Sequence, residues 1–271
     1  MRQFDPRKIK ALALDLDGTT LLPDTSLGER TAQCLKTLMS KGVDVIFCTG
    51  RAIEASEKYY SAIGAAGLMV FFNGAVLANV PECSTRDSSL LELDVVEFGI
   101  DIARSMDIHY QVYLPAGVEA GANSKWEALL IDKPRPEAEM YHRHTGITPL
   151  VKDLKTVIAA PGLPGCIKAM FITDPSLHDE IRQKMYARFG ERIYVTRTSP
   201  TFLEVMKTGV SKGTGLAAVM QRRGLAPEAV IACGDEESDI PMFSVAGFAA
   251  APSNAREKVR EAADYVYGSS A

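Results

Sequence analysis

Short apolar runs alternate with helical patterns at both ends of the chain, and this alternation restricts the fold more than any other feature. Strands are expected at residues 9–14 (IKALAL), 43–48 (VDVIFC) and 68–72 (LMVFF), with helices at about 28–41 and 52–63. Continuous apolar strands separated by helices indicate a parallel sheet that is covered on both faces. The first part of the chain therefore predicts an α/β domain.

The same pattern returns near the C-terminus. Residues 213–224 (GTGLAAVMQRRG) are helical with Gly224 as a stop, residues 229–233 (AVIAC) form a strand, and residues 263–268 (ADYVYG) form a last short strand. The middle mixes alternating strands with amphipathic helices, as an α+β unit does. Compact domains accept insertions at exposed loops, so we expect one core domain from residues 1–83 and 201–271, interrupted by an inserted domain at 84–200.

Charge and composition exclude several classes of protein. A formal net charge of -4 gives no basic footprint for nucleic acid. The five cysteines are scattered and never form Cys-x-x-Cys, so neither a disulfide framework nor a structural zinc site is expected. The uncharged stretch 59–81 is long enough to cross a bilayer, but its glycines and Asn73 divide it, so no membrane span is expected. The basic N-terminus lacks the apolar stretch of a secretory signal, so we expect a cytoplasmic protein.

Polar segments follow four of the predicted strands. They are DLDGTT at 15–20, TGR at 49–51, NGA at 73–75 and GDEESD at 234–239. In an open α/β sheet, ligands bind beyond the carboxyl ends of the strands, so these segments are expected to face one crevice. The period of a strand predicts that Asp15 and Asp17 point the same way.

The charges of these segments predict a metal. Four carboxylates (Asp15, Asp17, Asp235 and Asp239) stand against one cation, Lys212, at the start of a helix. An all-oxygen ligand set suits Mg²⁺, which binds a few carboxylates together with a substrate phosphate. With Mg²⁺ offsetting the carboxylates, one aspartate can attack phosphorus as a nucleophile.

DLDGTT, the Thr49 end of VDVIFCTGR, Lys212 and GDEESD, in this order, resemble the four motifs of the haloacid dehalogenase superfamily. NGA after the third strand, a cap-sized middle, TSPTFLEVMKTGVSKGTGL and SNAREKVREAADYV resemble the Cof-type (subclass IIB) hydrolases more narrowly. The resemblance implies a Rossmann-like, doubly wound parallel-sheet core with an inserted α+β cap of C2 type. It also implies a phosphatase that acts on small phosphorylated metabolites, such as sugar phosphates or phosphorylated cofactors, through an aspartyl-phosphate.

The resemblance also implies residue roles. Asp15 would be the nucleophile, and Asp17 would protonate the leaving oxygen and later activate water. Thr49, Gly50 and Lys212 would bind the phosphate.

For the metal, the resemblance implies that Asp15, the backbone carbonyl of Asp17, and Asp235 hold Mg²⁺. The expected outer residues are Asp239, Ser238 and Glu236. Ser238 departs from the family pattern, which has Asn there, and this predicts altered hydrogen bonding around the metal rather than its loss.

Several further residues have a structural interpretation beside a functional one. Arg51 is a candidate substrate contact or part of a turn, and Asn73-Gly74 is a candidate substrate contact or a tight turn. His142 and His144 lack metal-ligand partners at suitable spacing, so they are expected on a loop face.

Other functions remain open at this point. A phosphotransferase or phosphomutase would share the first step and differ in the acceptor, and a catalytically silent protein would bind the metabolite without turnover. A glycosyltransferase that uses Asp-x-Asp would leave GDEESD and Lys212 without a role. A receiver domain is about half this length. No pattern in the sequence indicates which substrate the protein binds or which oligomeric state it adopts.

Overall fold

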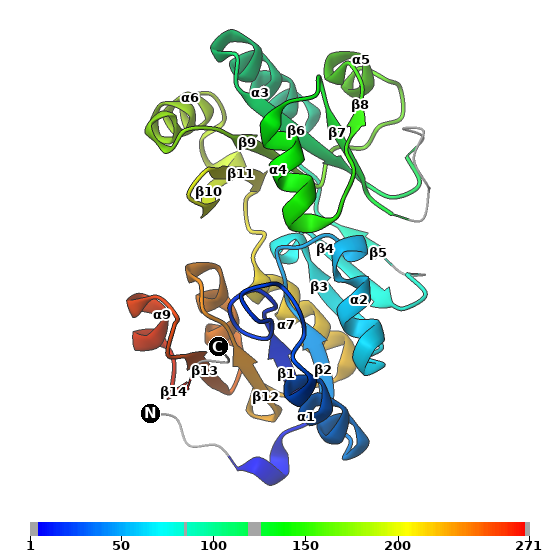
Figure 1. Cartoon of the computed structure of the whole chain (residues 1–271), viewed down its shortest axis with the longest axis vertical. Helices are drawn as coiled ribbons and strands as arrows, with labels where there is room; N and C mark the ends of the chain where they lie inside the picture. The colour runs from blue at the N-terminus through cyan, green and yellow to red at the C-terminus, as the bar shows by residue number, and fades with distance from the viewer. Residues whose placement is uncertain (1–4, 84–85, 119–125, 269–271) are drawn as a thin grey trace. The chain divides into compact units, whose positions relative to one another are not determined.

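The computed structural model describes residues 5–83, 86–118 and 126–268, and the chain divides into two compact units. The first unit contains Met1–Arg51, Ser56–Asp87 and Ser211–Ala271. The second contains Ala52–Ala55 and Ser88–Val210. Both ends of the chain thus contribute to the first unit, shown in blue and orange to red in Figure 1.

A parallel five-stranded sheet forms the centre of the first unit, with the strand order β14-β13-β12-β1-β2. Its strands are β1 (Ala11–Leu14), β2 (Asp44–Phe47), β12 (Val230–Cys233), β13 (Phe248–Pro252) and β14 (Tyr265–Tyr267). The central strands β1 and β12 are mostly apolar, as expected for strands that are buried on both faces. The expected α/β class and parallel sheet are confirmed.

Helices pack on this sheet and create its core. They are α1 (Glu29–Ser40), α7 (Lys212–Arg223), α8 (Ile240–Val245) and α9 (Glu257–Ala262). A further helix, α2 (Ile53–Ile63), follows β2 along the chain, and its first residues belong to the second unit. Leu216, Val219 and Met220 of α7 pack with Ala13 and Ala232 of the sheet in one buried cluster. The helix ends at Gly224, whose left-handed backbone terminates it as the sequence predicts.

The third apolar run differs from the prediction. β3 (Gly67–Phe71) pairs antiparallel with β4 (Val76–Val80) in a separate three-stranded sheet with β5 (Arg86–Ser88). One parallel bridge, Cys48 to Val70, links it to the end of β2. The tight turn at Asn73, with a φ of 54°, returns the chain at once along β3, so β4 becomes an antiparallel partner on one edge of β3.

The second unit is built on a six-stranded sheet with the order β10-β11-β9-β6-β7-β8. Its strands are β6 (His109–Leu114), β7 (Ala128–Ile131), β8 (Leu150–Val151), β9 (Lys168–Ile172), β10 (Ile193–Ser199) and β11 (Phe202–Lys207). Neighbouring strands are antiparallel except β7 and β8. Its helices are α3 (Leu93–Met106), α4 (Pro136–Thr145), α5 (Leu154–Ile158) and α6 (His178–Phe189).

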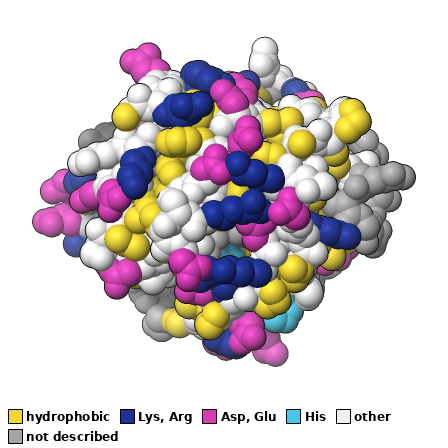
Figure 2. Space-filling model, turned by 90° about the horizontal axis from the view of Figure 1, so that it is seen from above, with side chains coloured by type: hydrophobic (Ala, Val, Ile, Leu, Met, Phe, Trp, Pro, Cys, Tyr) yellow, Lys and Arg dark blue, Asp and Glu magenta, His cyan; other side chains and the backbone are white. Residues whose placement is uncertain are grey.

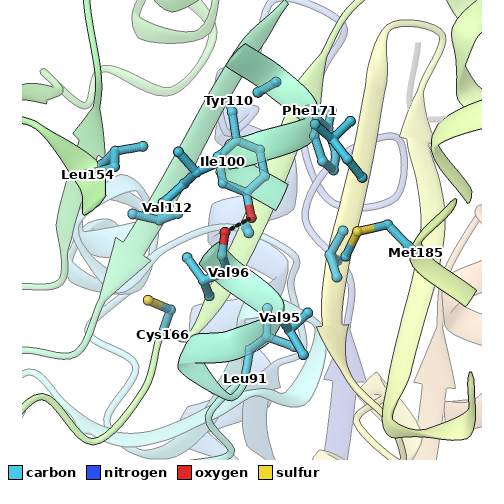
Figure 3. Packing of buried hydrophobic residues seen from close by; sticks show 14 of the residues in the cluster. Leu91, Val95, Val96, Ile100, Tyr110, Val112, Leu154, Cys166, Phe171 and Met185 are labelled. Atoms are coloured by element: carbon cyan, nitrogen blue, oxygen red, sulfur yellow. Dashed lines mark hydrogen bonds between the residues drawn. The ribbon is translucent and has the colours of Figure 1, made fainter. Parts of the chain in front are cut away.

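The core of the second unit lies between its sheet and the helices α3, α5 and α6. Val96 and Ile100 of α3 pack against Tyr110 and Phe171 of the sheet, and Met185 of α6 joins them (Figure 3). The Tyr110 hydroxyl donates a hydrogen bond to the Val96 carbonyl over 3.4 Å. This apolar layer gives the unit a core of its own.

The expectation of a loop around His142 and His144 is wrong. Both residues lie in the last turn of α4, which ends at Gly146 with a left-handed backbone. His142 Nδ1 lies 3.1 Å from the Ile147 carbonyl oxygen, so the ring contacts the segment that follows the helix. Basic side chains near a helix C-terminus are stabilising, which explains histidines in this position.

Short 3-10 segments connect these elements. They are Pro6–Lys8, Phe72–Gly74, Pro175–Leu177, Gly190–Arg192, Pro227–Ala229 and Glu237–Asp239.

The surface carries charges of both signs. On the face shown in Figure 2, Lys and Arg side chains alternate with Asp and Glu. Within the described ranges, no helix combines the length and the apolar character that spanning a membrane requires.

Candidate active site

Asp15 lies directly after β1, where its backbone N–H donates to the Cys233 carbonyl over 3.0 Å. Its side chain is buried, and Lys212 Nζ donates to Asp15 Oδ1 over 2.6 Å. The same ammonium donates to Asp239 Oδ1 over 2.7 Å. One buried cation therefore joins two carboxylates from distant parts of the chain.

Asp239 is fully buried and organises the loop after β12. Its Oδ2 accepts hydrogen bonds of 3.0 Å from the backbone N–H groups of Asp235 and Glu236. Gly234 lies so close that a Cβ there would overlap the Asp239 carboxylate. Asp239 thus contacts both Lys212 and the backbone that carries Asp235. A role for Asp239 in orienting Lys212 requires the first of these contacts.

Asp235 is partly buried and held by a residue that the sequence analysis missed. Thr19 Oγ1 donates to Asp235 Oδ1 over 2.7 Å. Gly18, with a φ of 76°, lies against the same carboxylate, and Asn254 Nδ2 donates to the Gly18 carbonyl over 3.0 Å. The threonines of DLDGTT were the available signal, because a hydroxyl two residues after Asp17 can reach a neighbouring strand end.

The electrostatics of this cluster are those of a site short of positive charge. Burial raises the pKa of Asp15 well above its ordinary value, and Asp239 and Asp235 add to the effect while Lys212 opposes it. Burial also raises the pKa of Asp235 to about 6, against the Thr19 hydrogen bond. Burial alone would lower the pKa of Lys212, but Asp15 and Asp239 raise it. One lysine does not balance three carboxylates.

The donor set fits a magnesium ion. Oxygen atoms of Asp15, Asp235 and Asp239 all lie within 4.8 Å of one another, and hard oxygen ligands are those that Mg²⁺ prefers. Among the described residues, this group contains Asp239 and does not contain the Asp17 carboxylate. The sequence analysis assigned the metal to the Asp17 backbone carbonyl, and that assignment stays a prediction.

Asp17 has a different partner from Asp15. Arg51 donates two hydrogen bonds to the Asp17 carboxylate, from Nε to Oδ2 over 2.7 Å and from Nη2 to Oδ1 over 2.6 Å. β1 ends at Leu14, so the strand period does not extend to Asp17, and the expectation that the two aspartates point the same way stays a prediction. Burial disfavours the charge on Arg51, but the bonds to Asp17 raise its pKa.

Thr49 and its neighbours form a compact turn after β2. Thr49 is fully buried, its N–H donates to the Val70 carbonyl, and its carbonyl accepts from Asn73, each over 2.9 Å. The Thr49 hydroxyl oxygen accepts from the Arg51 N–H over 3.1 Å. A Cβ at Gly50 would lie 2.9 Å from Asn73 Oδ1, so the two predicted site residues are neighbours.

Gly74 places the helix that carries Lys212. Its φ is 101°, and a Cβ there would overlap the backbone carbonyl of Ser211. Ser211 caps α7 through a reciprocal pair of contacts with Thr214, so Lys212 is the first residue of the helix. A cation is unfavourable at a helix N-terminus, and here the buried carboxylates compensate for it.

The remaining predicted residues lie at the edge of the cluster. Ser238 is in the 3-10 segment Glu237–Asp239, next to the buried Asp239. The half-exposed Glu236 carboxylate forms an ion pair with Arg256 Nε over 2.7 Å. The side chain of Glu236 is thus engaged on the surface, whereas its backbone N–H contacts Asp239.

Known proteins resemble this chain over most of its length. The family model described as haloacid dehalogenase-like hydrolase matches residues 12–271. A 5-amino-6-(5-phospho-D-ribitylamino)uracil phosphatase of Bacillus subtilis is 29% identical over 93% of this chain and 90% of its own length. An HMP-PP phosphatase of Cronobacter sakazakii is 28% identical over 87% of this chain and 80% of its own.

A solved structure supports the fold over nearly the whole length. The crystal structure of a haloacid dehalogenase-like hydrolase from Bacteroides thetaiotaomicron superimposes with a TM-score of 0.84 at 23% identity. The match covers 96% of this chain and 94% of that protein. The Rossmann-like core and the additional α+β unit are thus arrangements that known proteins share.

Proposed function

Since the chain belongs to the haloacid dehalogenase-like hydrolase family, we propose that it is a Mg²⁺-dependent phosphohydrolase with Asp15 as its nucleophile. The resemblance of its motifs to the Cof-type members is confirmed. One observation carries the proposal: the buried Asp15 carboxylate is held by Lys212 beside Asp235 and Asp239. An anchored carboxylate in this setting is suited to attack phosphorus.

The substrates we propose are small phosphorylated metabolites. The curated relatives are named as phosphatases of a phosphoribitylamino-uracil and of HMP-PP. The formal net charge of -4 and the mixed charges in Figure 2 do not favour a polyanionic partner such as nucleic acid. A sugar phosphate or a phosphorylated cofactor fits these observations, and a cytoplasmic setting stays a prediction.

The proposed reaction has two steps, each with a defined proton. Asp15 attacks phosphorus and forms an aspartyl-phosphate while the ester P–O bond breaks, and Asp17 gives its proton to the leaving oxygen. Asp17 then takes a proton from a water molecule that attacks the same phosphorus, which releases phosphate and restores Asp15. Thr49, Gly50 and Lys212 would hold the phosphate oxygens in both steps.

The residues that would hold Mg²⁺ are Asp15 and Asp235, with the Asp17 carbonyl. When bound, the ion neutralises negative charge on the carboxylates and the phosphate. Asp239 would keep Lys212 and the Asp235 backbone in place, because it accepts hydrogen bonds from Lys212 Nζ and from the N–H groups of Asp235 and Glu236. Ser238 and Glu236 would support this loop from outside.

We propose the second unit as the cap that selects the substrate. It has its own core and sheet, so it can be exchanged among relatives without altering the residues around Asp15. The second unit comprises Ala52–Ala55 and Ser88–Val210, whereas the predicted cap is 84–200. The prediction placed β11 in the core, but β11 pairs with β9 and β10 in the second unit. Arg51, Asn73 and Gly74 belong to the first unit apart from this cap.

The test is phosphate release from sugar phosphates, nucleotides, phosphorylated cofactors and 4-nitrophenyl phosphate, with Mg²⁺ or with EDTA. Wild type is compared with Asp15→Asn and with Asp24→Asn, a control on an exposed aspartate of the same loop. We expect release only with Mg²⁺, its loss in Asp15→Asn and its retention in Asp24→Asn. Release by Asp15→Asn at the wild-type rate would overturn the proposal, and transfer to a second sugar would indicate a phosphotransferase.

A further inference from the structure

Arg51 and Asp17 form the most complete side-chain contact near the proposed site that the reaction above does not use. Two parallel hydrogen bonds of 2.6 and 2.7 Å join the guanidinium to both carboxylate oxygens. Such paired bonds fix the plane of a carboxylate as well as its position. The pair therefore determines where Asp17 points.

The two partners differ in freedom. The side chain of Arg51 is 7% exposed, whereas that of Asp17 is 45% exposed. The Arg51 backbone is held at both ends, because its N–H donates to Thr49 Oγ1 over 3.1 Å and its carbonyl accepts from Phe72 over 3.1 Å. Arg51 is thus the fixed member, and the orientation of Asp17 depends on it.

Tyr59 of α2 extends this arrangement to the loop after Asp17. The Arg51 guanidinium lies over the Tyr59 ring, 5.6 Å from its centre. The Tyr59 hydroxyl donates to the Thr25 carbonyl over 2.8 Å. Asp17 and Thr25, which enclose one loop, are therefore both anchored to the segment that begins at Arg51.

We propose that Arg51 is a positioning residue that aims the Asp17 carboxylate for proton transfer, rather than a contact to the substrate. This inference rests on the proposed function, in which Asp17 is the acid and base. In the reaction, one Asp17 oxygen keeps its bond to Arg51. The other gives up its bond to Arg51, carries the proton to the leaving oxygen and later accepts a proton from water. Lysine can replace arginine only in part here, because its ammonium keeps the charge but lacks the planar pair of donors.

The inference separates substrates by their leaving groups. Release of an alcohol from glucose 6-phosphate needs a proton from an acid, whereas 4-nitrophenolate leaves readily without one. A positioned general acid contributes about 10²- to 10⁴-fold to a rate. If Asp17 is no longer correctly oriented, hydrolysis of glucose 6-phosphate therefore slows, whereas hydrolysis of 4-nitrophenyl phosphate does not.

The experiment compares kcat/KM on both substrates for wild type, Arg51→Gln, Arg51→Lys, Asp17→Asn and the double variant Arg51→Gln/Asp17→Asn. For Arg51→Gln we expect a loss of about tenfold or more on glucose 6-phosphate and less than about threefold on 4-nitrophenyl phosphate. Arg51→Lys should recover part of the loss. In the Asp17→Asn background, Arg51→Gln should add less than about twofold, because Arg51 acts through Asp17.

Lys58→Gln is the matched control. Lys58 Nζ lies 4.9 Å from the centre of the same Tyr59 ring, on the exposed side of α2, so this variant also removes a cation from that ring. We expect both substrates to be unaffected. Thermal unfolding of each variant checks that the fold is retained.

Three results would overturn the inference. An equal rise of KM on both substrates that persists in the Asp17→Asn background would make Arg51 a direct substrate contact. An unchanged ratio between the substrates would leave Arg51 with a structural role alone. Equal losses from Arg51→Gln and Lys58→Gln would assign the effect to the ring. If the proposed function itself is wrong, the result is different from these three. Wild type would then show no phosphate release that requires Mg²⁺ and Asp15.

Discussion

Lys212 Nζ donates to Asp15 Oδ1 over 2.6 Å and, with a second hydrogen, to Asp239 Oδ1 over 2.7 Å. All three side chains are almost completely buried. A single ammonium thus holds the proposed nucleophile against the loop that follows β12.

Replacement of this lysine is expected to destabilise the first unit. Lys212→Met leaves buried carboxylates without their cation, and removal of one member of a buried ion pair costs about 3–5 kcal/mol in the free energy of unfolding. Denaturant unfolding measures this cost, and phosphate release should be lost. Lys36→Met, on the exposed face of α1, is the control and should unfold like wild type. Equal stability of the two variants would contradict the buried-pair interpretation.

Magnesium is expected to stabilise the protein, and Asp235 should carry much of the effect. A ligand that binds only the folded state raises stability by mass action, by about 2.7 kcal/mol at 100 times its Kd. We expect Mg²⁺ to raise the unfolding temperature of wild type, EDTA to reverse the rise, and Asp235→Asn to reduce it strongly. Glu237→Gln is the control, because Glu237 is a nearby acid that contacts Arg256 and Lys258 on the surface. An equal response of both variants to Mg²⁺ would exclude Asp235 as a ligand.

Gly74→Ala should disturb Lys212 without touching a charge. Its φ of 101° strains any other residue, and the added Cβ would overlap the carbonyl of Ser211, which caps α7. Gly42→Ala is a matched control, since Gly42 has a φ of 80° and open space around its Cβ position. The strain alone costs about 1–2 kcal/mol in both variants. We expect a further loss of stability and a loss of phosphate release in Gly74→Ala only.

Similar phosphate release in the two glycine variants would show that the contact between Gly74 and Ser211 does not set the position of Lys212. The measurement also separates the two interpretations of NGA from the sequence. A turn residue that places a helix changes stability and activity together, whereas a substrate contact changes KM alone.

The sequence was sufficient for the parts of the fold that depend on local pattern. The strands β1, β2 and β12, and the helices α1 and α7, lie where the apolar periodicity places them. β3 was assigned to the wrong sheet because a continuous apolar run has the same composition in a parallel sheet and in a buried hairpin. What decides between them is the pairing partner β4, which periodicity does not specify.

The chemistry-bearing residues were also accessible from the sequence, but their partners were not. Asp15, Lys212, Asp235 and Asp239 meet because parallel strands end at one edge of a sheet, a general rule. The pairing of Asp17 with Arg51 depends on a loop conformation and on two side-chain rotamers, which no spacing rule predicts. Pairwise geometry of long side chains in loops therefore required the structure.

The ion pairs of Arg104 are expected to make the stability of the second unit sensitive to acid. Arg104 donates to Asp132 over 2.8 Å and 2.9 Å, and to Asp153 over 2.9 Å. Burial by itself would raise the pKa of Asp132, but Arg104 and the Leu154 N–H lower it. Hydrogen bonds from Thr156, and then from Arg104, lower the pKa of Asp153 to about 2.

A carboxylate with a lowered pKa in the folded state stabilises the protein above its ordinary pKa of 3.8 and loses this contribution as the pH falls toward about 2. We therefore expect the second unit of wild type to lose more stability between pH 4 and pH 2 than that of Arg104→Gln. Trp126, the single tryptophan of the chain, lies in this unit, so its fluorescence during thermal unfolding reports on it. Arg188→Gln removes an exposed arginine that lies over the Phe98 ring, and it should keep the wild-type pH dependence. A steeper loss in Arg104→Gln than in wild type would reverse the sign of the proposed linkage and contradict it.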